Sequence, residues 1–216
     1  MTLTNLKKRI YTSIVLFLLF LLIFKSNFIL VYSLIVLATL SILEFLNITR
    51  KIFRSKLFFS ITNFFFITYV LIFCFLFFYF ANFIQLKVIL FSLIISCIAS
   101  DVGGFVFGKI FKGPKLTKIS PNKTIAGAIG SLLFSNLLFI STIFFFTKQF
   151  SYTFLIIATI TSISCQFGDL LFSFLKRTVK IKDTGNFLPG HGGILDRLDG
   201  IFVGIPVGFI SIIYLF

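Results

Sequence analysis

Seven long apolar runs, separated by short stretches that carry nearly all of the charge, divide this 216-residue chain. A helix needs about 20 apolar residues to cross the hydrocarbon core of a bilayer. Only 12% of the residues are charged, whereas soluble domains average about 25%. The pattern therefore predicts an all-α, polytopic transmembrane helix bundle of about seven spans, and it excludes a water-soluble globular protein and a disordered chain. The predicted spans are residues 11–24, 28–47, 57–83, 88–108, 125–147, 152–175 and 199–216.

The basic residues predict the orientation of these spans. The chain has 20 Lys and Arg against 6 Asp and Glu, a net charge of +14, and the basic residues cluster between the apolar runs. With the N-terminus in the cytoplasm, all of them except Lys25, Lys87 and Lys148 fall on the cytoplasmic side, as the positive-inside rule requires. We therefore infer that the basic residues orient the helices in the membrane and contact lipid head groups, and we expect no nucleic-acid partner.

Two minor features have plain interpretations. The run at 11–24 follows a basic stretch, as a signal peptide would, but no small-residue cleavage site follows it, so we expect an uncleaved first helix. Cys74, Cys97 and Cys165 lie far apart inside apolar runs without a C-x-x-C pair, which predicts buried free thiols and no zinc site.

Two loops concentrate the glycine, proline and charge of the chain. We expect one integral membrane domain over residues 1–216, in which the helices of residues 1–83 form a scaffold. Residues 88–216 then form a catalytic half with cytoplasmic loops at 109–124 and 176–198. Because polar loops on a rigid scaffold are where chemistry concentrates, these two loops are the predicted active region.

Four aspartates reach a similar predicted depth on the cytoplasmic side: Asp101, Asp169, Asp196 and Asp199. An ionised carboxylate in hydrocarbon costs at least about 2.5–3.5 kcal/mol and usually faces a cavity or a partner. One interpretation is a structural pair of Asp169 with Lys176 or Arg197. The other is a shared cation, for which carboxylates beside substrate phosphates suit Mg²⁺.

Glycines and helix ends frame these acids. Gly104 and Gly108 follow Asp101 on one helix face, where they serve either helix packing or a ligand. Ser120-Pro121 fits an N-cap and first-turn pair for the fifth helix, and Lys123 beside it would complete an anion site. His191, the single histidine, is framed by glycines and is either a surface residue or a substrate contact. Carboxylates, a divalent cation and basic clusters suit phosphoryl or nucleotidyl transfer.

The run from Ser173 to Asp199, SFLKRTVKIKDTGNFLPGHGGILDRLD, resembles the signature of the phosphatidate cytidylyltransferases, the CDP-diacylglycerol synthases. That signature has S-x-x-K-R, then K-D-x-G, then H-G-G-x-x-D-R-x-D. Residues 100–109 and 120–127 are also similar to the family, and Lys8-Arg9 and Glu44 weakly so. The chain departs from the family at Ala126, where members usually carry Glu, and it is short for the family.

The resemblance implies that phosphatidate attacks the α-phosphorus of CTP, giving CDP-diacylglycerol and pyrophosphate. It implies Mg²⁺, with K⁺ as a second cation, held by the metal ligands Asp169 and Asp196. The implied catalytic residues are Asp169, Lys176, Arg177, Asp196, Arg197 and Asp199. The implied substrate-binding residues are Asp101, Ser120, Lys123, Thr124, Ser173, Lys182, Asp183, His191, Gly192 and Gly193.

The resemblance also implies a multi-pass protein of the bacterial inner membrane with its active site on the cytoplasmic side, and a homodimer is a further expectation. One alternative function is a CTP-dependent lipid kinase of the polyprenol or phytol type, which releases a nucleoside diphosphate instead of pyrophosphate. Another is an ion or phosphate transporter. One-sided charges and the lack of an internal repeat weigh against the transporter.

Overall fold

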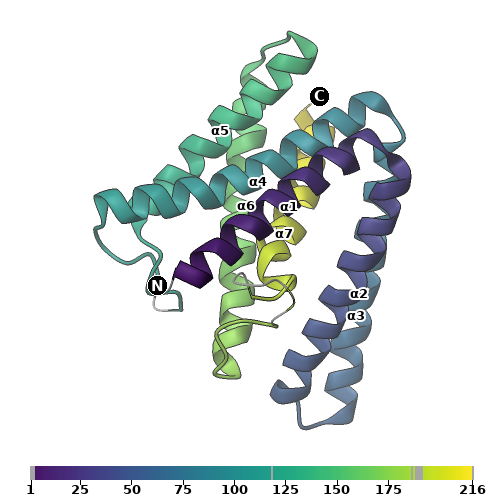
Figure 1. Cartoon of the computed structure of the whole chain (residues 1–216), viewed down its shortest axis with the longest axis vertical. Helices are drawn as coiled ribbons and strands as arrows, with labels where there is room; N and C mark the ends of the chain where they lie inside the picture. Colours follow the sequence, from purple (N-terminus) through teal and green to yellow (C-terminus); the bar gives the residue numbers. More distant parts are fainter. Residues whose placement is uncertain (1–2, 118, 186, 188–191, 216) are drawn as a thin grey trace. The chain divides into compact units, whose positions relative to one another are not determined.

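The computed structural model describes residues 3–117, 119–185, 187 and 192–215, and over these residues its regular structure is seven α-helices with no strand (Figure 1). The predicted all-α fold is therefore confirmed. The helices are α1 (Leu3–Lys25), α2 (Asn27–Ile52), α3 (Lys56–Ala81), α4 (Ile84–Phe111), α5 (Ile125–Thr147), α6 (Tyr152–Thr178) and α7 (Leu195–Leu215).

Helices α2 to α7 are each long and apolar enough to cross a membrane, so the chain is a multi-pass membrane protein. Helix α1 contains a shorter apolar segment, Tyr11–Lys25. The long run at 57–83 forms one continuous helix, α3, without a break. The side of the membrane on which the N-terminus lies stays a prediction.

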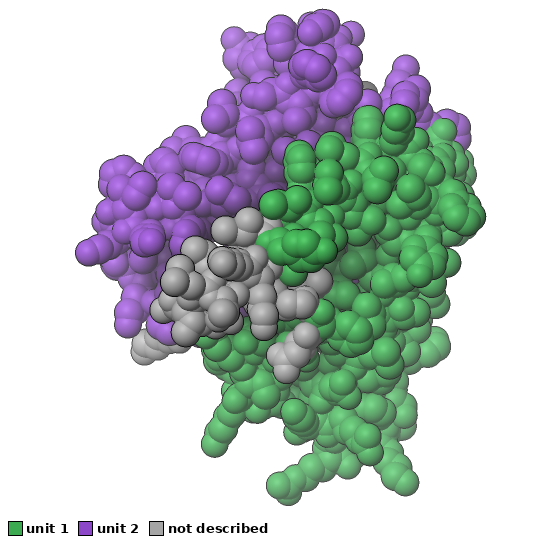
Figure 2. All heavy atoms as spheres, in the orientation of Figure 1, with its two compact units in different colours: residues 1–82, 175–198 green, residues 83–174, 199–216 purple. Residues whose placement is uncertain are grey.

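The chain forms two compact units, coloured separately in Figure 2. Unit 1 comprises residues 1–82 and 175–198, and unit 2 comprises residues 83–174 and 199–216. Unit 1 thus contains α1 to α3 and the loop that leads to α7, whereas unit 2 contains α4, α5 and most of α6 and α7.

In unit 1, helices α2 and α3 form a hairpin that is fixed by polar as well as aromatic contacts. The rings of Phe45 and Phe66 stack with centroids 3.8 Å apart. The Thr49 hydroxyl donates to Oδ1 of the buried Asn63 at 3.0 Å. Because apolar burial gives little drive between helices in lipid, such packing and hydrogen bonds carry much of the association.

In unit 2, helices α4 and α5 approach closely at glycines. A Cβ at Gly127 would lie 2.8 Å from the Gly104 carbonyl oxygen, and one at Gly108 would lie 3.2 Å from the Thr124 hydroxyl. Of the two interpretations of Gly104 and Gly108, the structure supports helix packing.

Buried hydroxyl groups add to this contact. Ser96 and Ser135 are 2.6 Å apart, and Ser100 and Ser162 are 2.9 Å apart, so hydrogen bonds join α4 to α5 and to α6 inside the unit. The three cysteines are free thiols, as predicted; Cys97 and Cys165 are buried as expected, whereas Cys74 is only partly buried.

Small residues also let α7 pack against α6 within unit 2. A Cβ at Gly200 would lie 2.9 Å from the Asp169 carboxylate, and one at Gly204 would lie 3.2 Å from the Cys165 Cβ. These glycines are one turn apart, so they form a stripe along one face of α7. The stripe brings the backbone of α7 close to Asp169 of α6.

Candidate active site

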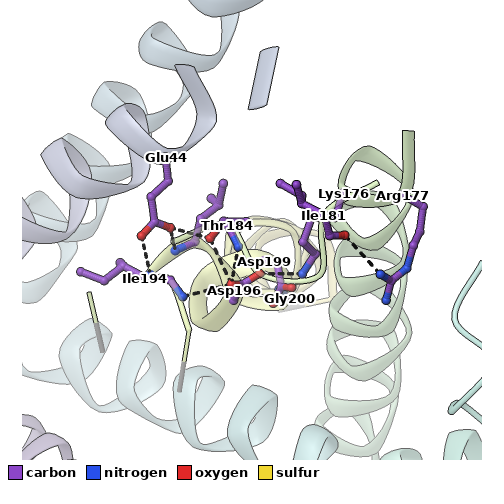
Figure 3. A network of polar contacts seen from close by, with 11 residues as sticks. Glu44, Lys176, Arg177, Ile181, Thr184, Ile194, Asp196, Asp199 and Gly200 are labelled. Atoms are coloured by element: carbon purple, nitrogen blue, oxygen red, sulfur yellow. Dashed lines mark hydrogen bonds and ion pairs between the residues drawn. The ribbon is translucent and has the colours of Figure 1, made fainter. Parts of the chain in front are cut away.

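The loop between α6 and α7 is folded back on the end of α6. The backbone N–H of Ile181 donates to the Lys176 carbonyl at 3.0 Å, and Lys180 adopts the left-handed conformation with φ 56°. The Arg177 guanidinium donates to the Ile181 carbonyl at 3.2 Å. The basic end of α6 is therefore fixed to the first residues of its own loop (Figure 3).

Asp196, in the first turn of α7, is the main acceptor for this loop. Its Oδ2 accepts hydrogen bonds from the backbone N–H of Thr184 at 2.8 Å and of Gly193 at 3.1 Å, and the Thr184 hydroxyl lies 3.1 Å away. Its Oδ1 accepts from the Lys176 ammonium at 2.6 Å. This buried ion pair joins the end of α6 to the start of α7 inside unit 1.

Glu44 of α2 holds the same loop from the other side, as Figure 3 shows. Its carboxylate accepts from the backbone N–H of Ile194 at 3.0 Å and of Leu195 at 2.9 Å, and from the Thr184 hydroxyl at 2.6 Å. Leu195 is the first residue of α7 and Ile194 directly precedes it; N–H groups at the start of a helix lack internal acceptors and favour a negative charge. Glu44, 3% exposed, is thus an N-terminal cap supplied from a distant helix.

Glycines of the motif make room for Glu44 and for the turn. A Cβ at Gly185 would lie 2.5 Å from Glu44 Oε1, and a Cβ at Gly193 would meet both Glu44 and Thr184. Gly192 adopts φ +83°, a conformation that favours glycine. There is therefore a steric reason for glycine at these positions of the K-D-x-G and G-G parts of the motif.

Unit 2 holds a second charged pair of predicted site residues. The Lys123 ammonium lies 3.0 Å from Asp169 Oδ2, so the loop before α5 is tied to α6. The loop is shaped by hydrogen bonds from the N–H of Leu116 to the Lys123 carbonyl and from the N–H of Ile125 to the Pro114 carbonyl. These bonds present Lys123 to Asp169.

The predicted start of the fifth helix at Ser120-Pro121 is wrong. Helix α5 begins at Ile125, and its N-cap is Thr124, whose hydroxyl accepts from the Gly127 N–H at 3.1 Å. The Ser120 carbonyl instead accepts from the Lys123 N–H, which closes a turn ahead of the helix. Ser120 therefore belongs to a turn, and the N-cap of α5 is Thr124, four residues later.

The remaining predicted residues are spread over both units. Asp199 is buried in unit 2 with its Oδ1 accepting from the Gly200 N–H at 3.0 Å, and Asp101 lies on an exposed part of α4. Ser173 is half-buried on α6. The side chains of three further predicted residues are exposed in unit 1: Lys182, Asp183 and Arg197. His191 lies outside the described residues.

The donor chemistry of the two predicted metal ligands fits a hard cation. Asp169 and Asp196 each hold a lysine ammonium on one carboxylate oxygen, at 3.0 Å and 2.6 Å. Over the residues that the structure describes, no three His, Cys, Asp or Glu side chains gather into a metal site. Asp196 belongs to unit 1 and Asp169 to unit 2, and the magnesium site stays a prediction.

Sequence reasoning assigned no role in the site to two residues of this network, Glu44 and Thr184. Glu44 carried a signal, because it is the only acid in the first 100 residues of the chain and sits inside an apolar run. An ionisable residue within a membrane span is by default a functional candidate with a partner. Thr184 had no comparable signal, since it occupies the variable position of K-D-x-G.

Comparisons with known proteins cover this region. Residues 55–215 match a family model described as the cytidylyltransferase family. The chain is 40% identical over 120 residues to a phosphatidate cytidylyltransferase of Mycobacterium leprae, over 55% of this chain and 38% of that protein.

Two further relatives carry the same name. One from Helicobacter pylori is 40% identical over 129 residues, 56% of this chain and 46% of its own length. One from Staphylococcus haemolyticus is 40% identical over 135 residues, 62% of this chain and 52% of its own length. The matched segments therefore span about half or less of these relatives.

Proposed function

The chain belongs to the cytidylyltransferase family, and we propose that it transfers the cytidylyl group of CTP to phosphatidate, giving CDP-diacylglycerol and pyrophosphate. The observation that carries the proposal is the loop between Lys176 and Asp196. It contains the motif of the family, and two carboxylates hold described residues on both sides of it: Asp196 accepts from Lys176 and Thr184, and Glu44 accepts from Leu195.

In the proposed reaction, a phosphate oxygen of phosphatidate forms a bond to the α-phosphorus of CTP, and the bond from that phosphorus to the bridging oxygen of pyrophosphate breaks. Such transfers depend mainly on alignment and charge neutralisation. We assign the neutralising role to Lys176, Arg177 and Arg197. Lys176 is oriented by Asp196 and Arg177 by the Ile181 carbonyl, so two of these cations have fixed directions.

Glu44 and Thr184 act as positioning residues in this proposal. Neither is assigned a contact with substrate; together they join Thr184 to the backbone of Ile194 and Leu195. A backbone held in this way keeps the motif cations in place before the substrates arrive, which lowers the entropic cost of alignment.

We propose Mg²⁺ as the cofactor, with Asp169 and Asp196 as its ligands and K⁺ as a second cation. When bound, the metal would supply Lewis-acid neutralisation of the phosphate charge. Lys123, which pairs with Asp169, would keep that carboxylate oriented.

We also propose that the protein lies in the bacterial inner membrane with the site facing the cytoplasm. The basic loops at 109–124 and 176–198 support this orientation under the positive-inside rule. A lipid substrate could then keep its acyl chains in the bilayer while its phosphate meets CTP. A homodimer stays an expectation of the family resemblance.

The test is an assay of the purified chain in detergent with phosphatidate, Mg²⁺ and CTP labelled on the α-phosphate. We expect label in CDP-diacylglycerol and an equal amount of pyrophosphate, and neither product with EDTA. Lipid labelled only from γ-labelled CTP, with release of CDP, would establish the lipid kinase instead. Phosphate uptake into vesicles without any turnover would establish a transporter. Either result would overturn the proposal.

A further inference from the structure

A basic pocket lies within unit 1 at the turn between α2 and α3, and neither the motif nor the proposed reaction uses it. It has a volume of about 530 Å³. The last turns of α2 supply one wall, and the beginning of α3 supplies the other. The lining residues are Leu43, Leu46, Asn47, Arg50, Phe53, Arg54, Ser55, Lys56 and Phe59.

The frame of the pocket is fixed by contacts within the helical hairpin. The Thr49 hydroxyl donates to Asn63, and Asn63 in turn donates to the Phe59 carbonyl at 2.7 Å, so the two walls are joined beside the pocket. The last turn of α2 ends with a hydrogen bond from the Phe53 N–H to the Thr49 carbonyl at 2.9 Å. The pocket is therefore set by ordered contacts on both of its helices.

The charge of the pocket is positive and is not neutralised by the residues that the structure describes. Arg50, Arg54 and Lys56 line it, and among the described residues no carboxylate pairs with any of the three. Three cations in one pocket repel one another, so an anion that enters it gains from all three. Helix α3 also begins here, at Lys56, and N–H groups of a first helical turn favour anions.

The other lining groups narrow the class of anion. Leu43, Leu46 and Phe59 form apolar surface next to the cations, whereas Asn47 and Ser55 offer neutral hydrogen-bonding groups. Inorganic phosphate would leave the apolar surface uncovered. A phospholipid would place its phosphate on the arginines, which match phosphate oxygens in pairs, and its glycerol and first methylene groups on the leucines and phenylalanines.

We propose that this pocket binds the phosphate headgroup of an anionic membrane phospholipid. The site is separate from the residues assigned to cytidylyl transfer, and its occupant need not be a substrate. Basic residues at a cytoplasmic membrane surface attract anionic lipids by about 1 kcal/mol each, so three converging cations give a useful affinity. Such a lipid would brace the hairpin that carries Glu44 on the same helix, α2.

The experiment is native mass spectrometry of the full-length chain in detergent, titrated with phosphatidylglycerol and with no CTP present. Phosphatidylglycerol is anionic but is not the proposed substrate, so the result does not depend on the proposed function. We expect one tightly bound lipid. Arg50→Gln and Arg54→Gln should each weaken its binding about fivefold, the equivalent of one lost cation.

Lys51 gives the matched control, because it is an exposed cation in the same turn of α2 that does not line the pocket. Lys51→Gln should change the affinity less than about twofold. Arg54→Lys, which keeps the charge, should restore part of the affinity, and circular dichroism should show the same helicity in all variants. If Lys51→Gln weakened lipid binding as much as Arg50→Gln and Arg54→Gln, the effect would be one of general surface charge, and the proposal would be overturned.

Competition with two other ligands identifies the molecule that occupies the pocket. Phosphatidylcholine, which has no net charge, should not compete, and inorganic phosphate should compete only at far higher concentration. Retention of phosphatidylcholine to the same extent as phosphatidylglycerol would overturn the proposal. Displacement of the lipid by inorganic phosphate at equal concentration would also overturn it, since the apolar wall would then contribute nothing.

Discussion

The Glu44 carboxylate accepts a hydrogen bond at 2.9 Å from the backbone N–H of Leu195, the residue at which helix α7 begins. The two residues are 151 positions apart in the chain. A membrane helix thus supplies the cap that the first turn of another helix lacks in its own sequence. The Leu195 N–H is buried, so without Glu44 it would lose an acceptor that water cannot readily replace.

Glu44→Gln is expected to lower kcat/KM for CTP about 10- to 100-fold, because a carboxamide nitrogen would face N–H donors where a carboxylate oxygen now accepts. Steady-state kinetics with CTP and phosphatidate would measure it. Thr39→Val is the control on the same helix, since the Thr39 hydroxyl bonds only backbone of α2. A Glu44→Gln enzyme with unchanged kcat and KM would show that the cap has no part in positioning.

Gly185→Ala is expected to reduce kcat at least about 10-fold, because the new methyl group would overlap Glu44 Oε1. Shortening the acid by Glu44→Asp should relieve that overlap. In a double-mutant cycle the added loss from Gly185→Ala should therefore be smaller in the Glu44→Asp background than in the wild type. Strict additivity of the two losses would mean that the two residues do not meet.

The fold was largely predictable because each membrane helix is encoded locally. A continuous apolar run predicts the helix, and the basic residues at its ends mark its limits. The runs predicted every helix, and the seventh begins at Leu195, ahead of its predicted span of 199–216. The error at Ser120 arose because a serine before a proline fits an N-cap as well as a turn, and only the hydrogen bond from the Lys123 N–H distinguishes them.

The site was less predictable because its main contacts join distant parts of the chain. The motif identified Lys176 and Asp196, but nothing in its spacing shows that Lys176 pairs with Asp196 or that Asp169 pairs with Lys123. Glu44 lies 140 residues before Thr184, so their contact depends on tertiary structure. A single sequence carries no signal for such pairs.

Lys123→Gln is expected to lower kcat about 10-fold, because the Asp169 carboxylate would lose its ammonium partner and the loop before α5 its attachment to α6. Lys115→Gln offers a matched control, since Lys115 is an exposed lysine of the same loop. The comparison is made at saturating substrate. Equal rates for the two variants would indicate that the ion pair is not needed for turnover.

Gly127→Val is expected to destabilise the protein by about 1–3 kcal/mol, because its side chain would be forced against the backbone of α4 at Gly104. Thermal unfolding in detergent, followed by circular dichroism, would show a lower midpoint. Ile129→Ala is the control on the same helix, since Ile129 is 53% exposed and a change there should leave the midpoint nearly unaltered. A wild-type midpoint for Gly127→Val would refute the close contact of α4 with α5.

Asp196→Asn is expected to lower the rate of cytidylyl transfer about 100-fold, and the dependence of the residual activity on Mg²⁺ distinguishes two reasons. If Asp196 binds metal, the variant should need at least about 10-fold more Mg²⁺ for half-maximal rate, since one anionic ligand is lost. If Asp196 only holds Lys176, Thr184 and Gly193, the maximal rate should fall with an unchanged Mg²⁺ requirement. Thr184→Val removes a hydroxyl that bonds to Asp196 but leaves every carboxylate in place. It should therefore lower the maximal rate without changing the Mg²⁺ requirement, which is the result expected of a purely structural loss. A normal turnover rate in Asp196→Asn would remove Asp196 from both roles.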